Sequence, residues 1–166
     1  MAYTAVIITL SDRASQGVYE DKTGPALQEL LEKSIPLDTV EKQIIPDEQA
    51  ELESIVIKYA DREKVDLIIT NGSTGVSPRD IAPDALLKVI EKRLPGFEEE
   101  MRRESRKVTI HAIISRAVCG IRGSSLIISV PGSPKGAVEN LQAIIGAIPH
   151  TIDKIKGDPS ECGKTL

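Results

Sequence analysis

The chain has 166 residues, of which 40% are hydrophobic and 28% are charged, and its formal net charge is -4. This length suits one domain with a buried core, because chains of this size hide about 70% of their unfolded surface. The 21 basic residues form no basic stripe, which argues against nucleic acid as a partner. We expect a cytoplasmic protein without a membrane span, because no apolar run approaches about 18 residues and no charged-then-apolar leader opens the chain.

The first half of the chain alternates β-rich apolar runs with stretches of helical period. Three strands are predicted, over residues 5–10, 39–45 and 66–70. A helix between the first two strands carries Leu27, Leu30 and Leu31 on one face, and another helix follows from about Asp47 to Ala60. Strands rich in Ile and Val with little alternation are typical of a parallel sheet that helices cover on both faces.

The next stretch contains two predicted helices. The first is a helical stripe that Pro95-Gly96 ends, and it consists of Leu86, Leu87, Ile90 and Leu94. The second is the charged sequence FEEEMRRESRK, residues 97–107. We expect this helix to face solvent, with Glu98, Glu99 and Glu100 on its hydrated side.

The last part of the chain combines a hairpin with a long helix. Residues 118–130 are predicted to form two strands that turn at Gly123-Ser124. The final helix begins near Lys135 and is expected to kink at Pro149. Together the elements predict an α/β fold, a three-layer α/β/α sandwich with a mostly parallel sheet and a small hairpin, in a single domain over 1–166.

Polar residues follow four of the predicted strands. They are Ser11-Asp12-Arg13, Asp47-Glu48, the loop TNGSTGVSPRD at 70–80, and Pro131-Gly132-Ser133-Pro134-Lys135. Because ligands of open α/β sheets bind beyond the carboxyl ends of the strands, these residues are expected at one rim. The set contains no Cys-His or Ser-His pair that would supply a nucleophile, and the two histidines, His111 and His150, lie elsewhere in the sequence.

This inventory suits phosphate chemistry. Glycines let the backbone approach phosphate oxygens, and hydroxyl and N–H groups donate to them. Asp47 and Asp80 are the natural pair to bind Mg²⁺, which proteins hold with one or two carboxylates plus substrate phosphates and water. Lys135 is placed to neutralise a phosphate oxygen.

Plainer structural roles are equally open for each of these residues taken alone. Asp47 is a candidate N-cap, a role worth about 1 kcal/mol. Asp80 and Ser77 are candidate caps of the helix that follows them, and Pro131–Pro134 is compatible with a sharp turn. The coincidence of Asp, Gly and Lys at one sheet edge favours a phosphate or nucleotide site.

Five longer stretches carry a family resemblance. They are SDRASQGVYEDKTGPAL, IIPDEQ, TNGSTGVSPRDIAPDAL, LPGFEEEMR and SRAVCGIRGSSLIISVPGSPKGAVENL. Together they resemble the MogA/MoaB family of molybdenum-cofactor biosynthesis proteins, which includes the G domain of gephyrin, and the similarity covers nearly the whole chain. The opening SDRAS and GVYED segments look closer to the MogA branch, molybdopterin adenylyltransferase, than to MoaB.

The resemblance implies a homotrimer that transfers AMP from Mg·ATP to the terminal phosphate of molybdopterin, releases pyrophosphate and hands the product to the molybdate-inserting enzyme. It implies that Asp47 and Asp80 are the essential acidic residues and act through Mg²⁺. The resemblance places the pterin and its phosphate at Ser11, Asp12 and Arg13. The nucleotide is expected at Gly72, Ser73, Thr74, Gly75, Ser77, Pro131, Gly132, Ser133 and Lys135.

One loop departs from the family pattern, which usually reads Thr-Gly-Gly-Thr-Gly. Asn71 is expected in the place of a glycine, where its tolerance of unusual backbone angles makes the change mild. Ser73 is expected to add a side chain near bound phosphate. Two alternatives stay open: a MoaB-type protein that binds the pterin with little or no adenylyl transfer, and a noncatalytic trimeric scaffold.

Overall fold

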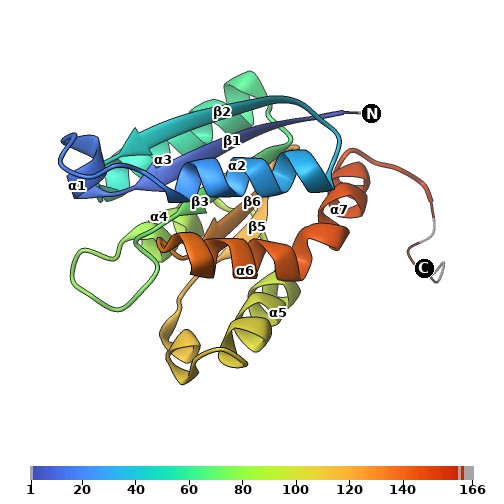
Figure 1. Cartoon of the computed structure of the whole chain (residues 1–166). Coiled ribbons are helices and arrows are strands. Elements are labelled where there is room, and N and C mark those ends of the chain that lie inside the picture. Colours follow the sequence, from blue (N-terminus) through green and yellow to red (C-terminus); the bar gives the residue numbers. More distant parts are fainter. Residues whose placement is uncertain (1, 161, 163–166) are drawn as a thin grey trace.

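The computed structural model describes residues 2–160 and 162, and it contains one six-stranded sheet between two layers of helices (Figure 1). The strands lie in the order β2-β1-β3-β6-β5-β4. Their bounds are β1 Tyr3–Leu10, β2 Leu37–Ile45, β3 Leu67–Asn71, β4 Lys92–Arg93, β5 Cys119–Arg122 and β6 Ser125–Val130. The strands β2, β1, β3 and β6 are mutually parallel, whereas β5 runs antiparallel to both β6 and β4. The predicted α/β class and the mostly parallel sheet are therefore confirmed.

The helices fall into two layers. Their bounds are α1 Asp12–Ser15, α2 Thr23–Ser34, α3 Gln49–Ile57, α4 Ala82–Val89, α5 Pro95–Arg106, α6 Pro134–Ile144 and α7 Ile148–Ile155. Shorter helical segments are the π-helical η1 (Lys58–Glu63) and the 3₁₀ segments η2 (Ile110–Ile114) and η3 (Ile145–Ala147). One hydrophobic cluster joins one face of the sheet to α2, α5, α6 and α7, and a second joins the other face to α3 and α4.

The side-chain pattern of the central strands explains why both faces are covered. In β1, Ile7 packs into the first cluster and Ile8 into the second, and both are fully buried. The same alternation holds for Ile68 and Ile69 in β3. Because successive side chains of a strand point to opposite faces, such continuous apolar runs stabilise a strand only between two helix layers. None of the helices that the structure describes is long and apolar enough to cross a membrane.

Two element boundaries differ from expectation. The helical stripe expected to reach Leu94 ends at Val89, and Lys92–Arg93 instead forms a short edge strand that pairs with β5. At the carboxyl end of the chain, α6 ends at Ile144, and Pro149 lies in the first turn of the separate helix α7. Proline fits this position because a first-turn N–H has no helical partner to lose. The single kinked helix that was expected is therefore two helices, α6 and α7, which the 3₁₀ segment η3 separates.

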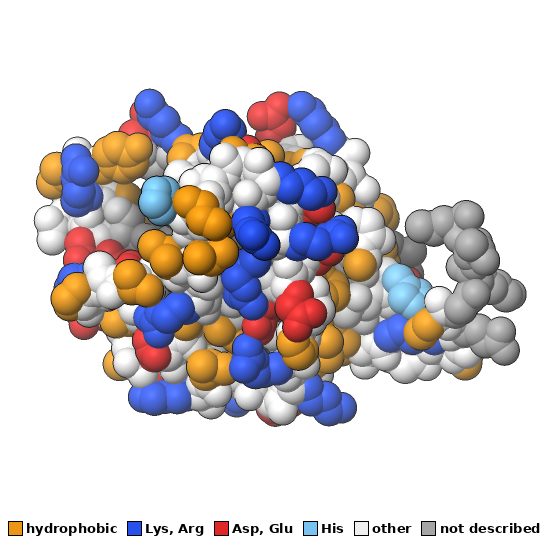
Figure 2. Space-filling view, turned by 90° about the horizontal axis from the view of Figure 1, so that it is seen from below, with side chains coloured by type: hydrophobic (Ala, Val, Ile, Leu, Met, Phe, Trp, Pro, Cys, Tyr) orange, Lys and Arg blue, Asp and Glu red, His pale blue; other side chains and the backbone are white. Residues whose placement is uncertain are grey.

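The 3₁₀ segment η2 carries an exposed apolar surface. Ile110, Ile113 and Ile114 of this segment and the preceding Val108 are each more than half exposed. We call these four residues the η2 patch. Figure 2 views the molecule from the side of α5 and α6 and shows hydrophobic side chains gathered on this face beside a row of basic ones. A contiguous exposed apolar group of this kind marks an interaction surface more often than chance.

The expectation of a hydrated face at Glu98–Glu100 is wrong for Glu98. This side chain is only 3% exposed, and its carboxylate contacts Arg93 at 2.6 Å and Arg102 at 3.6 Å. It also accepts the Cys119 N–H at 3.1 Å, which joins α5 to the edge of the sheet. Helical periodicity identified the polar side of α5, but Arg93 of β4 and Arg102 of α5 itself neutralise one member of that side.

We predict that Glu98→Gln lowers the free energy of unfolding by about 1–2 kcal/mol, because the amide keeps the shape but loses the charge that faces both arginines. Urea denaturation measures this value. Glu99→Gln, one residue away and exposed, is the matched control. Equal stability of the two variants would contradict a structural role for the Glu98 carboxylate.

Candidate functional site

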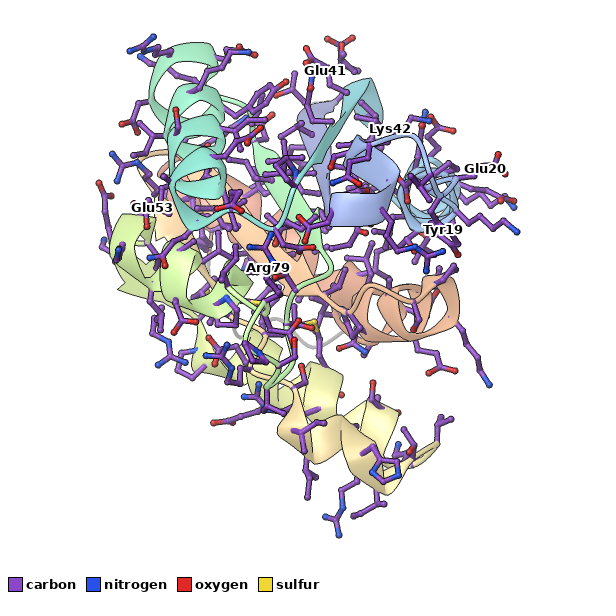
Figure 3. All side chains as sticks on the ribbon, turned by 90° about the vertical axis from the view of Figure 1, so that its left-hand side faces the viewer. Tyr19, Glu20, Glu41, Lys42, Glu53 and Arg79 are labelled. Carbon is purple, nitrogen blue, oxygen red and sulfur yellow. The ribbon has the colours of Figure 1, made fainter. Side chains whose placement is uncertain are left out.

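A cleft of ≈ 360 Å³ opens at the edge of the sheet where the parallel strands end. Figure 3 looks onto this edge, with Arg79 near the middle of the view. The cleft is lined by Thr9, Leu10, Ser11, Ala14, Tyr19, Asp21, Thr23, Asp47, Asn71, Gly72, Ser73, Ser77, Arg79, Asp80 and Gly132. These residues come from segments that follow or end β1, β2, β3 and β6, as expected for a ligand site of an open α/β sheet.

Backbone groups of three strand ends meet beneath the cleft at Gly72. Its φ of 94° lies in the left-handed region, and a Cβ atom there would stand 2.5 Å from the carbonyl oxygen of Leu10. The Gly72 N–H donates to the Val130 carbonyl at 3.1 Å. A Cβ at Gly132 would lie 3.1 Å from the Gly72 Cα. Only glycine permits this close approach, which leaves bare backbone available to a ligand.

The loop residues Asn71 and Ser73 differ in backbone conformation. Asn71 is the last residue of β3 and is buried, and its φ lies outside the left-handed region. The left-handed conformation belongs to Gly72 and to Ser73, whose φ is 59°. The Ser73 hydroxyl donates to the Arg79 carbonyl at 3.0 Å and accepts the Ile81 N–H at 2.9 Å. Its side chain therefore shapes the loop from within, although the residue also lines the cleft.

Asp12 and Asp47 join the loops that follow β1 and β2 by reciprocal hydrogen bonds. The Asp12 N–H donates to Asp47 Oδ2 at 3.1 Å, and the Asp47 N–H donates to Asp12 Oδ1 at 2.9 Å. Arg79 adds a forked contact to Asp12, with its Nη2 at 2.8 Å from both carboxylate oxygens. The Asp47 N–H bond, followed by the Arg79 contact, lowers the pKa of Asp12, so this carboxylate stays ionised.

Neither Asp47 nor Asp80 caps a helix. Glu48 is the N-cap residue of α3 and Ile81 is that of α4, and neither makes a side-chain cap. Asp80 instead accepts the Ser77 N–H through Oδ2 at 2.8 Å. Within the described residues, the second oxygen of Asp47 and that of Asp80 accept no hydrogen bond. Both carboxylates line the cleft, so each keeps an oxygen available to a ligand.

These two oxygens fit Mg²⁺ that arrives with a phosphorylated substrate. Among the described residues, no group of three or more His, Cys, Asp or Glu is placed to hold a metal ion by protein ligands alone. Mg²⁺ does not need such a group, because one or two carboxylates, substrate phosphates and water commonly complete its octahedral shell. Asp47 and Asp80 are the residues that would hold it.

Comparison with known proteins gives the family. A family model described as a probable molybdopterin binding domain matches residues 6–150. The chain belongs to this family. A molybdopterin adenylyltransferase of Helicobacter pylori strain J99 is 46% identical, over 92% of this chain and 87% of its own length. A molybdopterin adenylyltransferase of Escherichia coli strain K12 is 38% identical, over 91% of this chain and 84% of its own.

A solved structure agrees with this membership of the molybdopterin-binding family. The molybdopterin biosynthesis enzyme MoaB of Thermus thermophilus superposes with a TM-score of 0.86 and 38% identity, covering 96% of this chain and 99% of that chain. Structures described as MogA and as MoaB both match the whole fold. The resemblance read from the sequence is confirmed, and the fold alone does not separate the two branches.

The structure brings part of the predicted site together. Ser11, Asp47, Gly72, Ser73, Ser77, Asp80 and Gly132 line the cleft. Asp12 adjoins it through Asp47 and Arg79. Off the cleft lining are Arg13, Thr74, Gly75, Pro131, Ser133 and Lys135.

The residues off the lining have other contacts. Ser133 caps α6 by accepting the Gly136 N–H at 3.2 Å. Lys135 is 79% exposed and lies near Glu139. The Arg13 guanidinium lies 5.2 Å from the ring centre of Tyr19. A binding role for these residues stays a prediction.

Sequence reasoning missed a hydrogen-bonded network in the lining of the cleft. The Thr9 hydroxyl donates to Asp21 Oδ2 at 2.8 Å and accepts from Asn71 Nδ2 at 2.9 Å. Asp21 Oδ1 accepts the N–H groups of Thr23 and Gly24 at the start of α2, both at 3.0 Å. The Asp21 carboxylate is thus engaged at both oxygens and has a structural role. The sequence Asp-Lys-Thr-Gly before a helical stripe is a capping signal that would have found it.

Among the described residues, no cysteine or histidine lines the cleft, so its serine and threonine hydroxyls have no histidine there to act as a base. Cys119 is fully buried, and burial raises the pKa of its thiol to about 12. His111 and His150 are exposed and do not line the cleft, as their position in the sequence indicated. The nucleophile of a reaction in this cleft is therefore expected to come from a substrate.

Proposed function

We propose that this protein is a molybdopterin adenylyltransferase that transfers AMP from Mg·ATP to the terminal phosphate of molybdopterin and releases pyrophosphate. The observation that carries the proposal is 46% identity to an enzyme of that name over 92% of the chain. The cleft supports the same reaction, because bare backbone at Gly72 and Gly132 and two available carboxylates suit a polyphosphate.

The reaction needs no nucleophile from the protein. A phosphate monoester is largely ionised at neutral pH and attacks the α-phosphate of ATP directly. The protein contributes in-line positioning and neutralisation of charge. When bound to Asp47 and Asp80, Mg²⁺ would neutralise charge that develops on the phosphates. Backbone N–H groups of the loops after β3 and β6 would orient the nucleotide, and the loop after β1, with Ser11, Asp12 and Arg13, would face the pterin phosphate.

The charge of the cleft supports entry of ATP as its magnesium complex. The lining contains the carboxylates of Asp21, Asp47 and Asp80 but only one guanidinium, that of Arg79, in the part of the chain that the structure describes. A free triphosphate would meet net repulsion in such a cleft, whereas a divalent cation converts the carboxylates into ligands.

Product analysis tests the proposed function. ATP labelled at the α-phosphate is incubated with Mg²⁺, molybdopterin and the protein, and the label is followed by chromatography. The proposal expects label in adenylyl-molybdopterin. Bound pterin without labelled product would instead establish a MoaB-type binder, and self-association without binding of either substrate would establish a scaffold.

We propose that adenylyl-molybdopterin, the product, passes to a molybdate-inserting enzyme.

We further propose that the protein is a homotrimer, in which a neighbouring copy covers the η2 patch. Exposed isoleucines so close together favour burial in an interface. Light scattering is predicted to give three times the 18.0 kDa chain mass. Ile113→Asp is predicted to lower that mass, because burying a carboxylate without a partner is costly. A monomeric wild-type protein would contradict the homotrimer. An unchanged trimer in Ile113→Asp would contradict an interface at the η2 patch.

A further inference from the structure

We propose that Arg79 is a phosphate-binding side chain that Asp12 and Glu48 hold in reserve, and that it transfers to the triphosphate when the substrate enters the cleft. This inference deepens the proposed function and rests on it. It adds a second cation to the expected Lys135, which is 79% exposed and off the cleft lining.

The position of Arg79 makes it the available cation. Within the described chain, it is the one lysine or arginine that lines the cleft, and it lies near the middle of the strand-end edge in Figure 3. Asp80, one of the two carboxylates with an available oxygen, follows it directly in the sequence. A guanidinium beside the metal ligands is well placed to reach a polyphosphate bound through that metal.

The present partners of Arg79 occupy the geometry that a phosphate would take. Its Nε and Nη2 contact the two oxygens of Asp12 at 3.1 and 2.8 Å, the forked arrangement that guanidinium groups also make with phosphate. Nη2 additionally contacts Glu48 Oε1 at 3.1 Å. Two carboxylates thus share one guanidinium, and when Arg79 leaves them Asp12 keeps its hydrogen bond from the Asp47 N–H.

These ion pairs are weak enough to exchange. The side chains of Arg79, Asp12 and Glu48 are 56%, 36% and 58% exposed. Water and salt screen pairs with this exposure, and such pairs contribute little to stability. A phosphate oxygen held in the cleft by other contacts competes with them on favourable terms.

The shape of the loop does not depend on the Arg79 side chain, because other contacts hold the loop. Arg116 donates to the carbonyl oxygens of Gly75 at 2.8 Å and Asp80 at 2.7 Å, and it pairs with Asp84. The Ser73 hydroxyl fixes the backbone between residues 73 and 81. The guanidinium of Arg79 can therefore change partners while the loop keeps its position.

Titration calorimetry with Mg·ATP and with inorganic pyrophosphate tests the proposal, because two variants are expected to change the affinity in opposite directions. Arg79→Gln is expected to bind both about 10- to 100-fold more weakly, the loss typical of charge-assisted hydrogen bonds. Glu48→Gln is expected to bind both about two- to fivefold more tightly, because it removes a competitor of exposed ion-pair strength. Arg79→Lys should restore part of the loss, since it keeps the charge without the fork.

Glu53→Gln is the matched control. Glu53 lies on the same helix, α3, pairs with Lys88 of α4 at 3.2 Å, and lies apart from Arg79 in Figure 3. The substitution removes one carboxylate from the same region and should leave binding unchanged. If Glu48→Gln binds no more tightly than Glu53→Gln, or if Arg79→Gln binds like the wild type, the reserve model is overturned while the proposed function stands. If the wild-type protein binds neither ligand, both are overturned.

Discussion

Asp80→Asn is expected to reduce AMP transfer to molybdopterin about 10²- to 10³-fold, the scale of losing one preorganised electrostatic contact to a reacting group. The amide oxygen of Asn can still accept the Ser77 N–H that Asp80 accepts at 2.8 Å, so the loop keeps its hydrogen bond. What the variant loses is the negative oxygen that is available to Mg²⁺. The rate of labelled product formation at saturating substrates measures the effect.

A control variant separates this loss from a general effect of charge. Asp38 is exposed near the amino end of β2, whereas the cleft lies at the carboxyl ends of the parallel strands. Asp38→Asn should therefore transfer AMP at the wild-type rate. Circular dichroism and thermal unfolding of Asp80→Asn should match the wild type. Unchanged turnover in a folded Asp80→Asn protein would remove this carboxylate from the mechanism.

Gly72→Ala is expected to have the largest effect on stability. The new Cβ would stand 2.5 Å from the Leu10 carbonyl oxygen, a backbone atom that cannot turn aside, and the φ of 94° disfavours any residue with a Cβ. Left-handed strain and overpacking together predict a loss of about 2–5 kcal/mol in the free energy of unfolding. Urea denaturation, analysed as a two-state transition, measures it.

Gly96→Ala provides the comparison. Gly96 lies in the first turn of α5, and a Cβ there would meet nothing within 4 Å. Alanine in a helix without strain leaves stability unchanged or raises it slightly. Equal stability of Gly72→Ala and Gly96→Ala would show that the ends of β1 and β3 do not need their close approach.

The sheet and its layers were predictable because their signal is local. Apolar runs such as residues 5–10 coincide with buried strands, and helical periodicity located α2 and α3. The edge strand at Lys92–Arg93 carries no such signal, since two charged residues form it by pairing with β5. The burial of Glu98 likewise depends on Arg93 and on the Cys119 N–H, which only the tertiary fold brings to it, in addition to Arg102 four residues along the same helix.

The candidate site was predictable to the level of the loops that form it. Strand ends supplied Asp47, Gly72, Asp80 and Gly132, because parallel strands bring their carboxyl ends to one edge. Side-chain direction was not accessible from the sequence: Lys135, which was expected to reach a phosphate oxygen, lies off the cleft lining. Asp21 escaped notice because it precedes a helix rather than following a strand.

Pyrophosphate release from Mg·ATP, measured with and without molybdopterin, tests the central claim most directly. The account predicts release that requires both molybdopterin and Mg²⁺ and that falls to background in Asp47→Asn and in Asp80→Asn. Glu53→Gln, outside the cleft lining, should release pyrophosphate at the wild-type rate. Wild-type protein that binds molybdopterin but releases no pyrophosphate would contradict the account and establish a pterin-binding protein instead of an adenylyltransferase.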